Sequence, residues 1–120
     1  MPGINGVRFT DIKDILNFIT NNIGDKKLVL VIDELPYLAE ADKEFLSLLQ
    51  VEIDKNWLNK NIFLILSGSS ISFMEQEVLS SKSPIYGRRT MQIDLKPFNY
   101  LETALFVPDY SCEEKAICYG

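Results

Sequence analysis

The chain has no histidine and only two cysteines among its 120 residues. Without an imidazole, a Ser-His-Asp triad, His-ligated zinc and proton shuttling through histidine are all excluded. Cys112 and Cys118 both lie near the carboxyl end, and their spacing fits neither a metal motif nor a disulfide framework. A reducing cytoplasm is therefore the expected compartment.

Basic residues are also few, with 12 lysines and arginines against 17 aspartates and glutamates, and the net charge is -5. Because binding to a phosphate backbone needs a basic field, these residues are not expected to bind nucleic acid by themselves. No run approaches the ~18 apolar residues of a membrane-spanning helix, and the first residues do not resemble a signal peptide. The length predicts one domain at most, with a core of modest size.

Hydrophobic spacing predicts helices that alternate with strands. Two uniformly apolar runs, residues 28–32 and 62–66, are typical of strands buried on both faces of a parallel sheet. A third strand is predicted at residues 91–95, ended by Pro97. The first predicted helix is residues 10–24, capped by Thr10 or Asp11 and ended by Gly24, and the second is residues 41–60. A third opens with a capping box from Ser72 to Glu75, with Ser70 as the other candidate for its cap. A short piece at 103–107 and a last helix from Ser111 to Gly120 follow. This alternation predicts the α/β class with a parallel sheet.

Polar residues follow each of the first two predicted strands. Asp33 and Glu34 come directly after the first strand, and the sequence Ser-Gly-Ser-Ser at 67–70 follows the second. Because ligands of parallel α/β sheets bind beyond the carboxyl ends of the strands, we expect both groups at one ligand-binding edge. Hydrolysis of a nucleoside triphosphate suits such an edge. An aspartate can hold Mg²⁺ through its waters, a glutamate can polarise the attacking water, and a nearby arginine can stabilise the transition state.

Beyond these patterns, the chain shows a resemblance to a known family. The segments LVLVIDELPYLAEADKEFLSLLQ, NIFLILSGSSISFMEQEVLSSKSPIYGRRTMQIDLKPF and EEKAICYG resemble the prokaryotic, archaeal-type ATPases of the AAA+/STAND group of P-loop proteins. The resemblance covers about residues 28–120. It implies that Asp33 is the Walker B aspartate that holds magnesium, Glu34 the catalytic glutamate, Ser67 or alternatively Ser69 the sensor residue, and Arg88 the arginine finger, with Ser69 and Arg89 as further contacts to the nucleotide.

The sequence departs from that family in one motif. The phosphate loop, G-x-x-x-x-G-K-[S/T], is missing, because Gly3, Gly6 and Gly24 precede the acid pair and none is followed by Lys-Ser or Lys-Thr. That loop supplies most of the affinity for the triphosphate. We therefore expect residues 1–120 to be a partial ATPase core, with a lead-in and one helix at 1–26 and the Walker B to lid-linker region at 27–120. Alone it would bind ATP and Mg²⁺ weakly or not at all.

The resemblance also has consequences for assembly. It places the phosphate-loop strand between residues 62–66 and 91–95, so 91–95 is expected to lack a neighbour. The sheet would then rearrange, or this strand would pair with another copy of the chain. STAND relatives act as nucleotide-driven switches and often carry a helical and winged-helix portion. Contact with nucleic acid would therefore belong to a domain outside these 120 residues.

Three other interpretations stay open at the level of the sequence. The first is a phospho-acceptor receiver domain, although the helix predicted within residues 1–26 offers only Asp11 and Asp14 for its acidic pair. The second is an interaction domain without a ligand, in which Asp33 and Glu34 can be replaced without effect on any nucleotide-linked behaviour. The third is that the acid pair is a solvated strand end, and that Arg88 and Arg89 only favour solubility.

Overall fold

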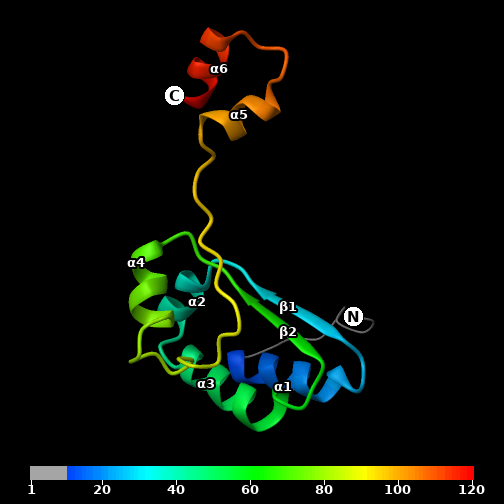
Figure 1. Cartoon of the computed structure of the whole chain (residues 1–120). Coiled ribbons are helices and arrows are strands. Elements are labelled where there is room, and N and C mark those ends of the chain that lie inside the picture. The colour runs from blue at the N-terminus through cyan, green and yellow to red at the C-terminus, as the bar shows by residue number, and fades with distance from the viewer. Residues whose placement is uncertain (1–10) are drawn as a thin grey trace. The chain divides into compact units, whose positions relative to one another are not determined.

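Figure 1 shows the chain as a computed structural model that describes residues 11–120. The chain divides after Arg89 into two compact units, the second of which is Thr90–Gly120. The predicted cap at Thr10 and the glycines Gly3 and Gly6 lie outside the described residues. None of the helices in residues 11–120 has the length and the apolar character needed to cross a membrane.

The first unit is built on two parallel strands, β1 (Leu28–Ile32) and β2 (Ile62–Leu66). Leu28 is opposite Ile62 and Ile32 is opposite Leu66, so the strands pair over their whole length. Both strands lie where the apolar runs predicted them. Since they are parallel and in register, their carboxyl ends meet at one edge of the sheet.

The first helix confirms its predicted signals. α1 (Ile12–Ile23) begins after Asp11, whose side chain accepts a hydrogen bond from the amide of Asp14, and it ends at Gly24, where φ is 55°. Glycine adopts this positive φ without steric strain, because it has no Cβ. Thus local chemistry at both ends sets the bounds of this helix.

The segment between the two strands contains more separate helices than predicted. The helix expected at residues 41–60 is α3 (Phe45–Glu52), continued by the π-helix η1 (Ile53–Trp57), and a separate helix α2 (Leu35–Ala41) precedes it. α2 was not predicted, although Pro36 stands in its first turn, a position that proline favours.

After β2 follow α4 (Ile71–Phe73) and the π-helix η2 (Met74–Val78). The predicted capping box from Ser72 to Glu75 is wrong. Ser70 caps this helix instead, because its hydroxyl accepts a hydrogen bond from the amide of Phe73.

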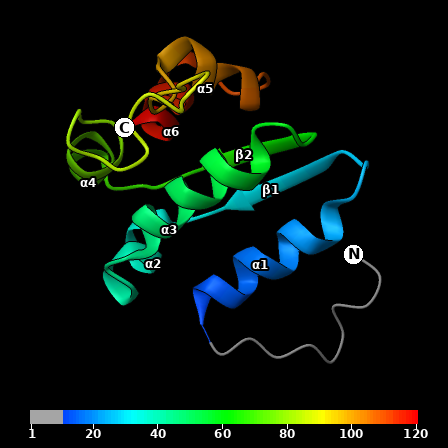
Figure 2. The same ribbon diagram turned by 90° about the horizontal axis from the view of Figure 1, so that it is seen from below.

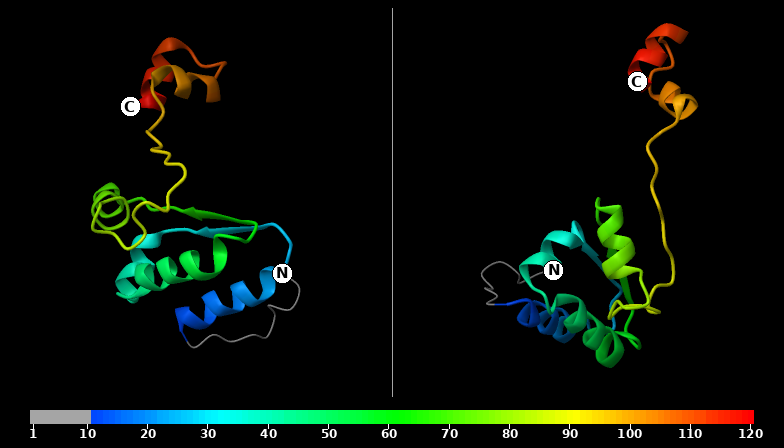
Figure 3. Two further views of the ribbon diagram at one scale, coloured as in Figure 1. Left: turned by 60° about the horizontal axis from the view of Figure 1, so that its bottom comes forward. Right: turned by 90° about the vertical axis from the view of Figure 1, so that its left-hand side faces the viewer.

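The core of the first unit lies between one face of the sheet and the helices. Figures 2 and 3 show α1 and α3 on the same side of β1 and β2. A buried polar group also joins these helices: Glu52 accepts hydrogen bonds from Thr20 on α1 and from Asn56, and the Trp57 indole donates to the Thr20 hydroxyl at 2.8 Å. The buried apolar residues are Leu16, Ile19, Ile23, Leu35, Phe45, Leu46, Leu49, Trp57, Val78 and Ile85.

The opposite face of the sheet is open, so the prediction of strands buried on both faces is wrong. Within residues 11–89, alternate side chains from Leu28 to Ile32 and from Ile62 to Leu66 pack against the core. The side chains between them, Val29, Val31, Phe63 and Ile65, are 37–55% exposed. Uniformly apolar strands predict a cover for both faces. The described helices of this unit cover only one face of the sheet.

The second unit begins with an extended segment and ends with two helices. Residues 91–95 form no strand, so the prediction of a third strand is wrong. A strand exists through hydrogen bonds to a neighbour, and among the described residues β1 and β2 pair only with each other. The apolar side chains of the segment are exposed, as expected for a strand that lacks a neighbour.

Both helices of the second unit start with a capping box. α5 (Tyr100–Phe106) is capped by Asn99 and Glu102, and α6 (Cys112–Tyr119) by Ser111 and Glu114. The start at Ser111 was predicted. The piece predicted at 103–107 belongs to the longer helix α5, whose cap at Asn99 was missed.

Candidate functional site

The predicted meeting of the two strand ends is confirmed. The Ser67 hydroxyl donates to Asp33 Oδ1 at 2.6 Å, and the Ser69 hydroxyl donates to Glu34 Oε2 at 3.2 Å. The backbone holds the same register, since the Ser67 amide donates to the Ile32 carbonyl and the Ser67 carbonyl accepts from the Leu35 amide. Each acid on the end of β1 is therefore held by one serine on the end of β2.

Glu34 adopts an unusual backbone conformation. Its φ of 52° and ψ of 48° lie in the left-handed region, where no other non-glycine residue among residues 11–120 is found. Its amide donates to Asp33 Oδ1 at 2.9 Å, and α2 starts at the next residue, so the chain turns sharply here. This conformation costs a residue with a Cβ about 1 kcal/mol. Such strain persists where the surroundings enforce it, commonly at functional sites.

We expect Glu34→Gly to raise the free energy of unfolding by up to about 1 kcal/mol, because glycine adopts the left-handed region without strain. Chemical denaturation of the purified chain measures this change. Glu34→Ala is the matched control, since it removes the same carboxylate but keeps the Cβ. If the alanine variant were as stable as the glycine variant, the backbone of Glu34 would not be strained.

A hollow of about 210 Å³ opens beside the acids. Among residues 11–120 its lining includes two carboxylates and no lysine or arginine, so the charge of these residues disfavours a bare triphosphate. Tyr37 also lines this hollow and is 72% exposed. The lining residues are Glu34, Pro36, Tyr37, Glu40, Ser69, Ser70 and Phe73.

The donor set of this edge fits a hydrated magnesium ion. Among residues 11–120, no group of three His, Cys, Asp or Glu side chains is placed to hold a metal directly. Asp33 is exposed, and one of its oxygens already accepts two hydrogen bonds. A single exposed carboxylate suits Mg²⁺, which keeps several waters and takes one or two protein carboxylates together with phosphate oxygens.

Arg88 does not lie with the acids. Its guanidinium binds Asp54 on η1 through Nη2 at 2.7 Å and Nε at 3.1 Å, and Nη1 donates to the carbonyls of Pro84 and Tyr86. The hydrogen bond from Arg88 lowers the pKa of Asp54, and the same bond raises the pKa of Arg88. Arg88 and Arg89 come just before the strand predicted at residues 91–95, which would have held them near an edge of the sheet, and that strand does not form. Arg89 is exposed.

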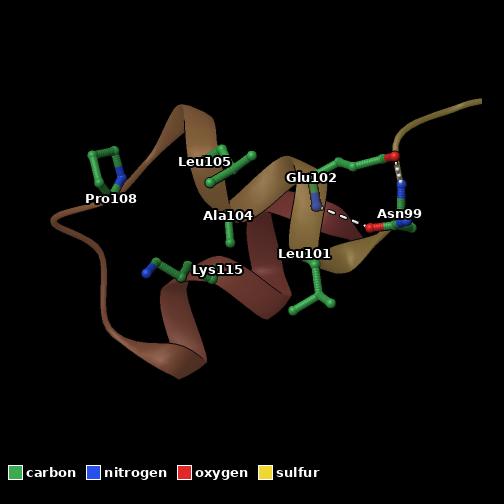
Figure 4. A pocket seen from close by; sticks show the side chains of 7 residues that line it. All are labelled: Asn99, Leu101, Glu102, Ala104, Leu105, Pro108 and Lys115. Carbon is green, nitrogen blue, oxygen red and sulfur yellow. Dashed lines mark hydrogen bonds between the residues drawn. The ribbon is translucent and has the colours of Figure 1, made fainter.

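A second hollow, of about 650 Å³, lies in the second unit beside α5 and is broad and open (Figure 4). Glu102 in its lining is engaged in the capping box with Asn99. No predicted site residue lines it. The lining residues are Asn99, Leu101, Glu102, Ala104, Leu105, Pro108 and Lys115.

Sequence reasoning missed Pro36 and Glu40 as residues beside the acids. A signal was present: with a helix from Leu35, Pro36 and Glu40 stand four residues apart and therefore share one helix face. Tyr37 stands three residues before Glu40, which also places these two side chains next to each other on the helix. Because α2 was not predicted, this face was not considered.

The fold and this edge define an α/β protein with a parallel strand pair and acids at the ligand-binding end. The sequence defines it further: residues 4–117 match the family described as the ATPase domain predominantly from Archaea, and the chain belongs to that family.

Two relatives from Methanocaldococcus jannaschii are similar to the chain. The uncharacterized protein MJECL04 is 40% identical over 100 residues, which are 83% of this chain and 22% of that protein. The uncharacterized protein MJ0424 is 33% identical over 57 residues, 48% of this chain and 55% of that protein. The chain thus spans about a fifth and about half of the lengths of these relatives. No solved structure is significantly similar to it.

Proposed function

We propose that the edge formed by Asp33, Glu34, Ser67 and Ser69 is the Walker B and sensor part of an ATP site of the AAA+/STAND type. Asp33 would hold the hydrated Mg²⁺ that bridges the phosphates. Glu34 would orient and polarise the attacking water, and Ser67 would sense the γ-phosphate, with Ser69 beside it on the nucleotide. The whole protein would use ATP to hold one conformation and hydrolysis to reset it.

One observation carries this proposal: the two acids at the end of β1 are each hydrogen-bonded to a serine at the end of β2. Carboxylates and hydroxyls are the ligands that magnesium, water and phosphate oxygens require. Membership of an archaeal-type ATPase family supports ATP as the nucleotide.

Residues 1–120 alone would bind ATP weakly or not at all. The sequence holds no G-x-x-x-x-G-K-[S/T] loop, and no basic residue from the described part of the chain lines the hollow beside Glu34. Most triphosphate affinity comes from such a loop, whose amides and lysine cradle the phosphates. We propose that these residues are a partial core, with the phosphate cradle and the lid provided by other parts of the protein.

The role of Arg88 is part of the same proposal. As an arginine finger, with Arg89 as a nucleotide contact, it would have to exchange its partner Asp54 for the transferred phosphate. Contacts with nucleic acid, if the whole protein makes them, would belong to a further domain, since residues 1–120 carry a net charge of -5.

Titration of the purified chain with a fluorescent ATP analogue, with and without Mg²⁺, tests this proposal. We expect weak binding that does not saturate and a magnesium-dependent component that is lost in Asp33→Asn. Asp25→Asn is the matched control, because Asp25 is an exposed aspartate in the turn before β1. It should leave the titration unchanged.

Two results would contradict parts of the proposal in different ways. Binding that is insensitive to both Mg²⁺ and Asp33→Asn would place the nucleotide elsewhere. Saturable, magnesium-dependent binding that is lost in Asp33→Asn would keep the site and refute the weak affinity. So would rapid ATP hydrolysis by the chain that Glu34→Gln abolishes.

A further inference from the structure

Ser67 is fixed to the end of β1 by its backbone and its side chain together. Its amide donates to the Ile32 carbonyl at 3.0 Å, and its carbonyl accepts from the Leu35 amide at 2.9 Å. These two bonds place the Ser67 hydroxyl beside Asp33, to which it donates at 2.6 Å. The side chain of Ser67 can therefore be changed while the backbone bonds still hold the two strand ends together.

The Ser67 hydroxyl and the Glu34 amide both bind the same oxygen of Asp33. They donate to Oδ1 at 2.6 Å and 2.9 Å. A carboxylate oxygen has about two lone-pair sites, so these two donors fill the acceptor capacity of Oδ1. A water molecule of a hydrated magnesium ion therefore has to be accepted by the other oxygen, Oδ2.

We propose that Ser67 positions Asp33 for magnesium: it holds Oδ1 and so assigns Oδ2 to the waters of the ion. This role of Ser67 rests on the proposed function, in which Asp33 holds the hydrated Mg²⁺. Carboxylates that bind metal ions are commonly oriented by hydrogen bonds from neighbouring groups. Asp33 is exposed, so without such a bond its carboxylate would have to be ordered when the ion binds, at a cost in conformational entropy.

The single proton of the Ser67 hydroxyl separates two roles of this residue. Carboxylate and phosphate oxygens only accept hydrogen bonds, and a serine hydroxyl has one proton to donate. The proposed contact of Ser67 with the γ-phosphate needs the same proton that Ser67 donates to Asp33 in this structure. Ser67 therefore orients Asp33 while no γ-phosphate is bound, and its effect on metal binding is measured in the chain without nucleotide.

Ser69 provides the matched comparison. Its hydroxyl donates to Glu34 Oε2 at 3.2 Å, a longer bond to the acid that is not assigned to the metal. Both serines follow β2, and each donates to one acid of the pair. Replacing Ser69 by alanine removes the same atom from the same edge, but it leaves Asp33 Oδ1 with both of its donors.

Binding of Mn²⁺ to the purified chain tests the proposal, since Mn²⁺ takes the same oxygen ligands as Mg²⁺ and broadens the NMR signals of nearby amides. The titration follows the amides of Asp33 and Glu34. Ser67→Ala should raise the dissociation constant at this edge by about tenfold, the lower end of the usual loss for groups that orient a metal ligand. Ser67→Thr keeps the hydroxyl, and both it and Ser69→Ala should stay within about threefold of the unchanged chain.

A further variant, Asp33→Asn, distinguishes a failure of this role from a failure of the proposed function. If Asp33→Asn and Ser67→Ala both weaken Mn²⁺ binding and the two controls do not, Ser67 positions Asp33. If only Asp33→Asn weakens it, Ser67 has no such role and the proposed magnesium site stands. If the broadening persists in Asp33→Asn, the proposed site fails, and the role of Ser67 with it.

The controls also exclude a general loosening of the strand ends. Losses in Ser69→Ala or in Ser67→Thr as large as that in Ser67→Ala would overturn the proposal, because the effect would then not depend on the hydroxyl that binds Asp33. Hydrogen exchange of the Ser67 amide, which is bonded to Ile32, checks that each variant keeps the two strands paired.

Discussion

Leu49→Ala is expected to lower the free energy of unfolding of the chain by about 3 kcal/mol, within the range of about 2–5 kcal/mol for buried leucines. The Leu49 side chain is fully buried on α3, in the cluster that joins the sheet to α1. Truncation removes its apolar contacts and leaves a cavity that the neighbouring side chains fill only in part. In a chain of this size, whose total stability is of order 5–15 kcal/mol, such a loss is large.

The matched control stands nine residues further along. Leu58 directly follows η1 and is 69% exposed, and the backbone hydrogen bond of its amide to Ile53 does not depend on its side chain. Leu58→Ala should change the stability by less than about 0.5 kcal/mol. Urea denaturation followed by the fluorescence of Trp57 measures both variants. Similar losses in the two would mean that α3 does not pack on the sheet as described.

The strands and their ligand edge could be predicted from local sequence. An apolar run of five residues with polar residues directly after it predicts a strand and its end, and parallel topology then brings Asp33 and Ser67 together. The ends of α1 could also be predicted from local sequence. The Asp11 side chain caps the first turn, and the backbone of Gly24 adopts the positive φ at the other end.

The predictions that were wrong concerned contacts between residues far apart in the sequence, or a choice between two residues that suit the same position. Residues 91–95 have the sequence of a strand, but a strand needs a neighbour that no sequence pattern guarantees. The partner of Arg88 is Asp54, 34 residues away, and nothing in the local sequence selects that pair. Ser70 and Ser72 are both suitable N-cap residues, and Ser70 is the one that caps the helix in the structure.

Gly68 is important both for the packing of the first unit and for the geometry of the proposed site. It lies between the two serines that hold the acids, and a Cβ built on it would be 2.9 Å from Pro36 Cδ and 2.9 Å from Met74 Sδ. Both distances are too short for carbon contacts. The Met74 side chain is flexible and can move away, but the ring of Pro36 is rigid and belongs to the first turn of α2, directly after the acid pair. The end of β2 therefore approaches that of β1 only because residue 68 has no side chain.

Gly68→Ala is accordingly expected to destabilise the chain by about 1–3 kcal/mol, the usual cost of overpacking. A second variant identifies the cause. Met74→Ala in the Gly68→Ala background removes one of the two clashes and keeps the other, so it should restore little of the loss if Pro36 is the limiting contact.

Because the methyl group pushes the two strand ends apart, the hydrogen bonds from Ser67 to Asp33 and from Ser69 to Glu34 should weaken together. Denaturation of the single and double variants measures the energies, and the chemical shifts of the Asp33 and Glu34 amides report the displacement. A Gly68→Ala chain with unchanged stability and unchanged shifts would mean that the two ends are further apart than described, and the held acid pair on which the proposed ATP site depends would not exist.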